Sequence, residues 1–489
     1  MLKERLRFLI KDTALYGVAN AFSKVISFLT LPIIVKQIDA SEFGIWNLLT
    51  IIGGIICAVS IFGMDSAVVR YYFDDKKEEH QKNIFSQGFF VQLVLVFFFI
   101  LVGFIIPGAL LWSVNVSNIY INSLYLILVW VPGSIFIQYL QNWFKWTFQR
   151  TKFLILSLGY TGINLVLLFI FFQFGKLSLN YILLVQAVSA SLFSLVGIWW
   201  CRKLFVFKPD WAIINKLIIF GFPMMFVMAI SILSPSLDRI FLVRFLDAEQ
   251  LGIYSFGQKL SAIMTVGVVA FQAAFGPFAF SIWETPDASR TFSRFQSYYI
   301  LLAGAIALGI CSFGKPLIVL MGTEKYFGTE KYLPYLVLGV MIYGLYSFAS
   351  LGIFYSKKIR FNLLALTIGI GCNVLFNFIF IRHFREYGAA AGFLFGNTVL
   401  VLIGYYFSSK YYKISFSSVK DFILILVLGA GALASTLTVH DHIWIDALIK
   451  SIIGITSFLF IGFIFLTGNE KAFIIRVVVS VFQNSSSKN

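Results

Sequence analysis

The stretch KQIDASEFGIW, from Lys36 to Trp46, has a second copy in RFLDAEQLGIY, from Arg244 to Tyr254. Each copy begins with a cation, continues through Asp-Ala, and ends in Gly-Ile followed by an aromatic residue. A pattern of this length, written twice in one chain, is typical of an internal repeat in which two parts of the chain fold alike. The pair therefore predicts two lobes of related architecture.

Composition indicates the solvent in which these lobes fold. The chain has 489 residues, of which 59% are hydrophobic and only 12% are charged, whereas soluble domains carry roughly 25% charged residues. Apolar stretches of about 20 residues, long enough to cross a bilayer as a helix, recur along the whole chain. The basic N-terminal stretch is followed by no small-residue cleavage site, so the first span is expected to be retained. These features predict an all-α polytopic membrane protein.

A window of about 19 residues predicts fourteen transmembrane helices separated by short polar connections. They cover residues 13–35, 44–66, 84–107, 119–140, 153–174, 179–200, 213–234, 254–281, 295–320, 333–355, 362–381, 387–407, 420–438 and 443–466.

The distribution of basic residues gives the orientation of these spans. Among the 38 lysines and arginines, about three lie in the termini and even-numbered loops for each one in the odd-numbered loops, as expected if both termini are cytoplasmic. The basic residues are spread over eight short segments and form no continuous patch, which disfavours nucleic-acid binding as the reason for the net charge of +16.

The two copies of the repeat lie between spans 1 and 2 and between spans 7 and 8, so an even number of spans separates them. Both lobes therefore enter the membrane in the same direction, as in parallel repeats related by an axis along the membrane normal. The predicted division is a first lobe of spans 1–6 at residues 1–205, a second lobe of spans 7–12 at residues 206–412, and spans 13 and 14 with the tail at residues 413–489.

Within the repeat, most residues have an architectural explanation. Asp39 with Glu42, and Asp247 with Gln250, have the spacing of capping boxes that open the following helices. Gly44 and Gly252, the glycines of Gly-Ile, are the residues expected where two helices approach closely. Direct contact with substrate is the alternative reading of the motif.

These features resemble a known family. The two parallel lobes, the repeated turn, FGMDSAVVRYYFD (Phe62–Asp74) and SPSLDRIFLVRFLDAEQLGIYS in the second lobe are similar to the polysaccharide-transporter branch of the multidrug/oligosaccharidyl-lipid/polysaccharide exporter superfamily. Within it, the chain resembles the O-antigen-type flippases of lipid-linked oligosaccharides. The resemblance implies alternating access between two six-helix lobes.

Charged residues at membrane depth are candidate binding residues, because each costs about 2.5 kcal/mol or more in lipid. Lys24 lies near the middle of span 1, with Asn20 on the same helix face. A cation in a water-filled cavity, aimed at an anionic head group, is the functional hypothesis, and a structural pair with a carboxylate is the alternative. Lys259 in span 8 matches the cations that related flippases place there, and a snorkelling side chain is its alternative.

Two further charge pairs are candidates for gating or ion coupling. Asp238 and Arg239, at the outer end of span 7, are adjacent and are expected to find separate partners. Asp65, at the end of span 2, is a candidate gate partner of Arg70. Pro223 and Pro235 are expected to break or kink span 7.

The sequence also disfavours several functions. It contains no phosphate-binding loop of an ATPase, and no outer loop large enough for the paired acids of a membrane glycosyltransferase. His440–His442 occupy a turn too tight for a good metal site, so no metal is expected.

The leading hypothesis is a flippase that carries a polyprenyl-pyrophosphate-linked oligosaccharide from the inner to the outer leaflet of a bacterial cytoplasmic membrane. No cofactor is expected beyond coupling to sodium or protons, with Asp65 or Asp238 as the coupling site. The expected partners are the lipid-linked substrate, membrane lipid and polysaccharide polymerase machinery. The alternatives are a multidrug exporter, which a midplane lysine disfavours because such exporters carry cations, and a lipid scramblase or scaffold.

Overall fold

The computed structural model describes residues 2–465, except residues 76, 114, 176, 234–235, 284, 357, 413–417 and 438–441. Within these residues the regular structure is entirely helical, which confirms the predicted all-α class. Each of the fourteen predicted spans coincides with one helix, with two consecutive helices, or with one arm of a helical hairpin.

The part of the chain predicted to form the first lobe contains eight α-helices. They are α1 (Leu2–Val35), α2 (Ala40–Ile61), α3 (Met64–Tyr72), α4 (Glu78–Ile105), α5 (Pro107–Ser113), α6 (Ile121–Trp146), α7 (Arg150–Gln173) and α8 (Leu179–Trp200), with short 3-10 turns η1 (Asn118–Tyr120) and η2 (Arg202–Leu204). Predicted span 2 is broken between α2 and α3, where Phe62 and Gly63 both have positive φ angles, of 51° and 65°.

The remaining helices belong to the second lobe and to the two C-terminal spans. They are α9 (Trp211–Leu233), α10 (Leu237–Leu242), α11 (Ala248–Ile282), α12 (Ala288–Ser312), α13 (Gly314–Met321), η4 (Glu324–Tyr326), α14 (Thr329–Ala349), α15 (Leu351–Tyr355), α16 (Ile359–Ser409), α17 (Ser418–Leu437) and α18 (Ile443–Phe465). Helix α17 packs on α12 and α14, and α18 packs on α12, α13 and α17, so both extend the second lobe.

Helix α16 is a hairpin of two antiparallel arms. Its backbone leaves helical geometry at Arg385, where φ is 49° and ψ is −124°. The arms then run side by side: a Cβ built on Gly392 would lie 3.0 Å from Oδ1 of Asn377, and one on Gly396 would lie 2.7 Å from Cβ of Asn373. The two arms correspond to predicted spans 11 and 12.

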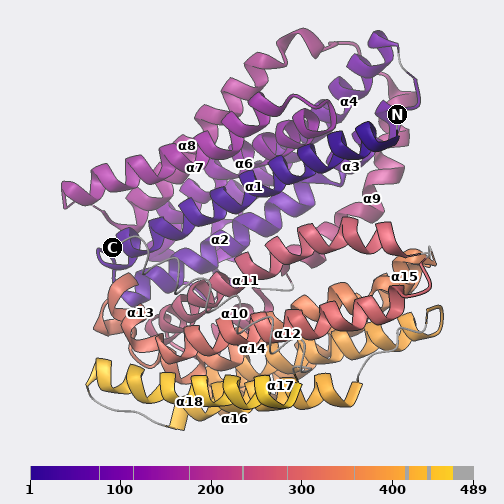
Figure 1. The fold of residues 1–489 in the computed structure, drawn as a ribbon. Helices are drawn as coiled ribbons and strands as arrows, with labels where there is room; N and C mark the ends of the chain where they lie inside the picture. The colour runs from indigo at the N-terminus through magenta and orange to yellow at the C-terminus, as the bar shows by residue number, and fades with distance from the viewer. Residues whose placement is uncertain are drawn as a thin grey trace, which may run out of the picture.

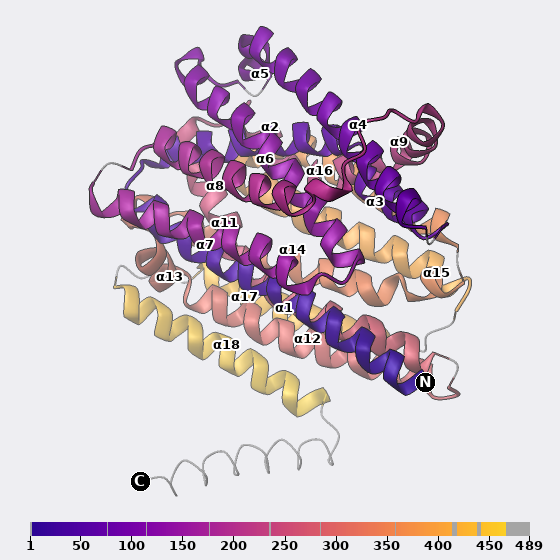
Figure 2. The same cartoon turned by 90° about the horizontal axis from the view of Figure 1, so that it is seen from above.

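The two lobes lie one above the other in Figure 1, with α2 and α11 at their boundary. Helices α2 and α11 form the main contact between the lobes, and α1 adds a smaller contact with α11 and α13. Helix α9 departs from the predicted division, because it packs on α2, α3 and α4 of the first lobe, as both views show (Figures 1 and 2). Gly63 and Gly221 allow this close packing, since a Cβ on either would collide with backbone of the other segment.

The outer surface of the bundle is apolar, as expected for a protein surrounded by lipid. Large side chains such as Phe97, Phe98, Leu402 and Leu426 are more than half exposed. Among the described residues, nine helical stretches are long and apolar enough to cross a membrane, and one of them is the two-armed α16. The chain is therefore a multi-pass membrane protein, while the number of fourteen spans stays a prediction.

Candidate functional site

The two copies of the repeat meet each other at one end of the molecule and close the lobes there. A Cβ built on Gly44 would lie 2.9 Å from the backbone nitrogen of Gly252, and one built on Gly252 would collide with the carbonyl oxygen of Ala40. The contact is reciprocal, because Gly44 faces Ala248 as Gly252 faces Ala40. Only glycine permits such an approach, which is why the motif carries Gly in both copies. The predicted topology places this closed end on the outer side.

The aspartate half of the predicted capping box forms in the second copy and does not form in the first. In the second copy, Asp247 accepts a hydrogen bond from the backbone N–H of Gln250, at 2.8 Å. In the first copy, Asp39 is the N-cap of α2 but makes no side-chain cap. Its carboxylate instead lies 2.6 Å from Nζ of Lys325, which follows α13 in the other lobe. The first copy has exchanged its cap for an ion pair between lobes.

Lys24 is exposed, and its helical spacing places it on the face of α1 that packs on the second lobe nearer the closed end. Residues of α1 on the same face nearer its C-terminal end, Leu31 and Val35, are buried, and Val35 contacts Gly322 of the second lobe. Lys24 lies two to three turns farther from the closed end, and there this face is exposed. The apolar exposed residues of α1, such as Phe22, lie on another face.

No carboxylate within the described residues forms an ion pair with Lys24, so the structural alternative of a paired lysine finds no support here. Ser27, also exposed, continues the polar face of Lys24. Asn20 lies in α1 on the predicted face, but its side chain is outside the described residues.

Lys259 lies at the boundary of the lobes. Its Nζ is 5.5 Å from the ring centroid of Trp46, so a cation of the second lobe rests on an aromatic ring of the first. Trp46 is the aromatic residue that ends the first copy of the repeat. Arg239 lies close enough to Lys259 for the two positive charges to repel each other.

The two lysines lie at similar distances along their helices from the end where the repeats meet. Lys24 is eleven residues before Val35, the last residue of α1, and Lys259 is eleven residues after Ala248, the first residue of α11. At 1.5 Å per residue, each is about 16 Å along its helix from the closed end. Each lobe therefore carries one cation at a similar distance from the closed end.

Asp238 is buried and is held by polar groups of α11. Its Oδ2 accepts hydrogen bonds from the hydroxyl of Tyr254, at 2.6 Å, and from the side-chain amide of Gln258. Arg239 donates to the hydroxyl of Ser236 at 3.2 Å, so the two adjacent residues have separate hydrogen-bond partners. They also lie in a loose ion pair of 3.8 Å, which the sequence did not predict. Of the predicted breaks in span 7, Pro223 lies inside helix α9, and Pro235 is outside the described residues.

Asp65 and Arg70 are not brought together. Asp65 is buried at the start of α3, where it accepts hydrogen bonds from the backbone of Ser66 at 2.8 Å and from Asn142 at 3.0 Å. Arg70 is exposed and pairs with Asp74 at 3.0 Å, one helical turn away. The predicted gate pair is thus replaced by two separate interactions in this conformation.

Three residues of this region, which the sequence did not identify as site residues, contact the predicted ones: Trp46, Tyr254 and Gln258. Trp46 and Tyr254 occupy the same aromatic position of the two copies, so their shared place in the repeat is the signal that could have identified them. Gln258 lies one turn after Tyr254 on α11, and only the structure relates it to Asp238. The tight turn His440–His442, where no metal is expected, falls largely outside the described residues.

Comparison with known proteins establishes the family. Residues 9–283, more than half of the chain, match the model of a family described as polysaccharide biosynthesis protein. The chain belongs to this family. The capsular polysaccharide biosynthesis protein CapF of Staphylococcus aureus is 21% identical over 417 residues, which cover 82% of this chain and all of that protein.

Solved structures show that this family member shares a transporter fold. The lipid II flippase MurJ in an inward closed conformation matches with a TM-score of 0.68 and 17% identity, over 92% of this chain and 98% of that one. An inward-facing multidrug resistance transporter of the MATE family matches with a TM-score of 0.64 and 14% identity, over 84% and 95% of the two chains. Together with the family match, these structures confirm the resemblance to the polysaccharide-transporter branch of the multidrug/oligosaccharidyl-lipid/polysaccharide exporter superfamily.

Proposed function

We propose that this protein is a flippase that moves a polyprenyl-pyrophosphate-linked oligosaccharide from the inner to the outer leaflet of a bacterial cytoplasmic membrane. The observation that supports the proposal is the pair Lys24 and Lys259, one cation from each lobe at a similar distance along its helix from the closed end. A pyrophosphate carries several acceptor oxygens and negative charge, so it can accept charge-assisted hydrogen bonds from both lysines.

The mechanism that fits this geometry is alternating access. The lobes are closed at the Gly44–Gly252 contact, and Lys24 is exposed between them farther from that end. With both termini cytoplasmic, this conformation receives substrate from the inner leaflet. Because Lys24 and Lys259 belong to different lobes, a rocking motion that opens the outer end changes their separation and helps to release the pyrophosphate. The lipid tail stays in the bilayer beside the lobes.

The competing function is export of cationic drugs, because the chain shares its fold with a multidrug resistance transporter of the MATE family. The two lysines repel a cationic substrate. Asp238, a buried acid of the second lobe, already accepts hydrogen bonds from Tyr254 and Gln258. The site therefore favours an anionic head group.

The experiment that tests the proposal is flipping of a polyprenyl-pyrophosphate oligosaccharide by the purified protein in proteoliposomes. We expect the intact protein to flip the lipid and the double variant Lys24→Ala, Lys259→Ala to lose most of this activity. Lys216→Ala is the matched control, because Lys216 is an exposed lysine on α9, which packs on α2, α3 and α4 and carries neither Lys24 nor Lys259.

Two results would contradict the proposal in different ways. Unchanged flipping in the double variant would exclude the two lysines as the pyrophosphate site. Absence of flipping by the intact protein, together with export of a cationic dye, would establish the drug exporter instead.

Energy coupling, partners and enzymatic activity follow from this proposal. A transporter needs no catalytic residues, so we propose that the protein is not an enzyme and needs no cofactor beyond a sodium or proton gradient, with Asp238 as the first residue to test for coupling. We also propose that polysaccharide polymerase machinery receives the flipped lipid. Flipping rates with an imposed sodium gradient, a proton gradient and neither will show whether coupling exists.

A further inference from the structure

A concave site that includes neither lysine lies in the second lobe, at the tip of the α16 hairpin. It is a pocket of about 750 Å³, lined by Tyr335 of α14 and by residues on both sides of the turn, among them Phe384, Arg385, Glu386 and Tyr387. The predicted topology places this tip, between spans 11 and 12, on the outer side of the membrane. Its volume falls in the range of sites that hold small molecules.

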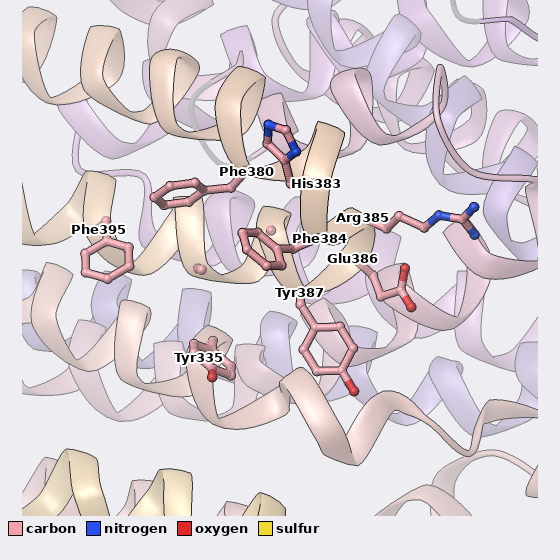
Figure 3. Close-up of a pocket in the computed structure, with 10 residues that line it drawn as sticks. Tyr335, Phe380, His383, Phe384, Arg385, Glu386, Tyr387 and Phe395 are labelled. Atoms are coloured by element: carbon pink, nitrogen blue, oxygen red, sulfur yellow. The ribbon is translucent and has the colours of Figure 1, made fainter.

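The lining combines aromatic faces with polar groups of both signs. Figure 3 shows the rings of Tyr335, Phe384 and Phe395 on one side of the pocket and the side chains of Arg385 and Glu386 on the other. The cation and the carboxylate balance, so the lining favours neither a pyrophosphate nor a polycation. Aromatic rings offer apolar faces against which a flat apolar surface packs, while the charged groups form hydrogen bonds at its edge.

One polar atom of the pocket lining is buried without a hydrogen-bond partner in the described part of the chain. Oε2 of Glu386 is buried and has no hydrogen-bond partner within the described residues. A buried acceptor without a donor is costly, and such atoms in folded proteins call for an explanation. A ligand in the pocket provides a donor if the Glu386 carboxylate turns so that a ligand hydroxyl can reach Oε2.

The backbone at the pocket is also held in an unusual conformation. Arg385 has φ 49° and ψ −124°, which is the geometry of the first central residue of a type II′ turn, where glycine dominates. An arginine in this conformation is strained, and such strain is concentrated at functional sites. Arg385 is among the lining residues, and its exposed side chain extends away from the rings of Phe384 and Phe395 (Figure 3).

We propose that this pocket is a saccharide-binding subsite on the outer face of the second lobe, where the sugar part of the lipid-linked substrate binds after it has crossed. Sugar rings present apolar C–H faces that pack on aromatic rings, and hydroxyls that donate to carboxylates and accept from guanidinium groups. This inference rests on the proposed function. A peptide segment of a protein partner is the alternative occupant. The purely structural alternative is that the aromatic residues anchor the hairpin at the membrane interface.

An aromatic series connects the subsite with the central site. The ring of Tyr387 is in edge contact with that of Tyr332 at 6.1 Å, and the ring of Tyr332 lies 5.6 Å from that of Tyr254. Tyr254 donates its hydroxyl proton to Asp238 in a hydrogen bond. Packing therefore runs without interruption from the outer pocket to the residues beside Lys259.

The test uses the full-length protein in lipid nanodiscs and, as probe, the water-soluble saccharide released by mild acid from the lipid used in the flipping assay. Binding is measured by saturation-transfer NMR titration. We expect Phe384→Ala and Glu386→Gln each to weaken binding by about tenfold. Phe378→Ala is the matched control, because Phe378 is an exposed aromatic residue of α16 that does not line the pocket.

The outcomes separate this proposal from the flippase proposal. Equal binding by the variants and the intact protein overturns the subsite, whether or not the protein flips lipid. Flipping that fails while the saccharide still binds in a Glu386-dependent manner overturns the flippase and leaves the subsite. Unchanged saccharide binding with a lower unfolding temperature in Phe384→Ala identifies an interfacial anchor. Glu386→Gln, which keeps the shape of the side chain, guards against loss of folding.

Discussion

Trp46 positions Lys259 through a direct cation–π contact. The ring lies under an ammonium group that has no ion pair within the described residues, so the cation–π contact holds this charge between the lobes. Such a contact is worth about 0.5 to 2 kcal/mol. A residue of the repeat thereby positions a residue of the proposed pyrophosphate site.

We therefore expect Trp46→Leu to lower the flipping rate by about threefold to thirtyfold, because Lys259 loses its position. Trp46→Phe keeps a ring face and should retain most of the rate. The control is Trp199→Leu, which removes a different cation–π contact, with Arg202 on the surface of the first lobe. Equal rates in Trp46→Leu and the intact protein would show that the contact has no positioning role.

Arg385 allows a prediction about stability that is independent of transport. Replacing it with glycine relieves a backbone conformation that costs about 1 to 3 kcal/mol in other residues, less the flexibility that glycine adds to the unfolded chain. We expect Arg385→Gly to raise the thermal unfolding temperature, by a free energy of about 1 kcal/mol.

The comparison is Arg382→Gly, which removes an exposed arginine three residues earlier, where the backbone is helical. That variant should be destabilised by about 0.5 to 1 kcal/mol. Differential scanning fluorimetry in one detergent compares both variants with the intact protein. A lower unfolding temperature for Arg385→Gly would mean that loss of the arginine side-chain contacts destabilises the protein more than relief of backbone strain stabilises it.

At the scale of elements, the contact between α2 and α11 is the structure that closes the outer end. Adding side chains where Gly44 and Gly252 meet would force the two helices apart. Gly252→Val should therefore leave each lobe folded and favour conformations that are open to the outside. In a background without native cysteines, Trp46→Cys should react faster with a membrane-impermeant maleimide once Gly252→Val is added.

Gly371→Val is the control for this experiment, because no atom lies within 4 Å of the Cβ that it would add to α16. Its labelling rate at position 46 should equal that of the parent. Slow labelling in both glycine variants would contradict the assignment of this contact as the outer closure.

Elements were predicted best where apolar length decides them. The arms of α16 coincide with predicted spans 11 and 12 because the turn between them is polar and short. The break between α2 and α3 was missed, because the positive φ angles at Phe62 and Gly63 follow from tertiary packing of Gly63 against Gly221. Hydrophobic length carries no information on such contacts.

At the scale of the whole molecule, the repeat predicted that the chain has two related lobes, and it predicted glycine contacts without naming their partners. That Gly44 would meet Gly252 requires knowing how the lobes dock. Lys24 was predicted from the cost of burying charge, a rule that applies to each helix alone, and Lys259 from the resemblance to flippases with a cation on the same span. The contact of Lys259 with Trp46 depends on the arrangement of both lobes, which local patterns do not contain.

The ion pair between Asp39 and Lys325 gives a prediction about the balance between conformations. It bridges the lobes at the closed end, and both side chains are more than half exposed. Exposed pairs contribute roughly 0 to 1 kcal/mol and weaken with salt. Lys325→Glu replaces attraction with repulsion, so we expect a shift toward outward-open conformations of about fivefold.

Spin labels on the outer ends of the two lobes can measure this population by electron–electron distance. The exchanged variant Asp39→Lys, Lys325→Asp should restore the closed population, since it restores the attraction with the same two positions. Lys331→Glu, at another exposed lysine of the second lobe, should have little effect. If Lys325→Glu shifts the population equally at low and high salt, the cause is lost packing at η4 and not the ion pair, because only the ion pair is screened.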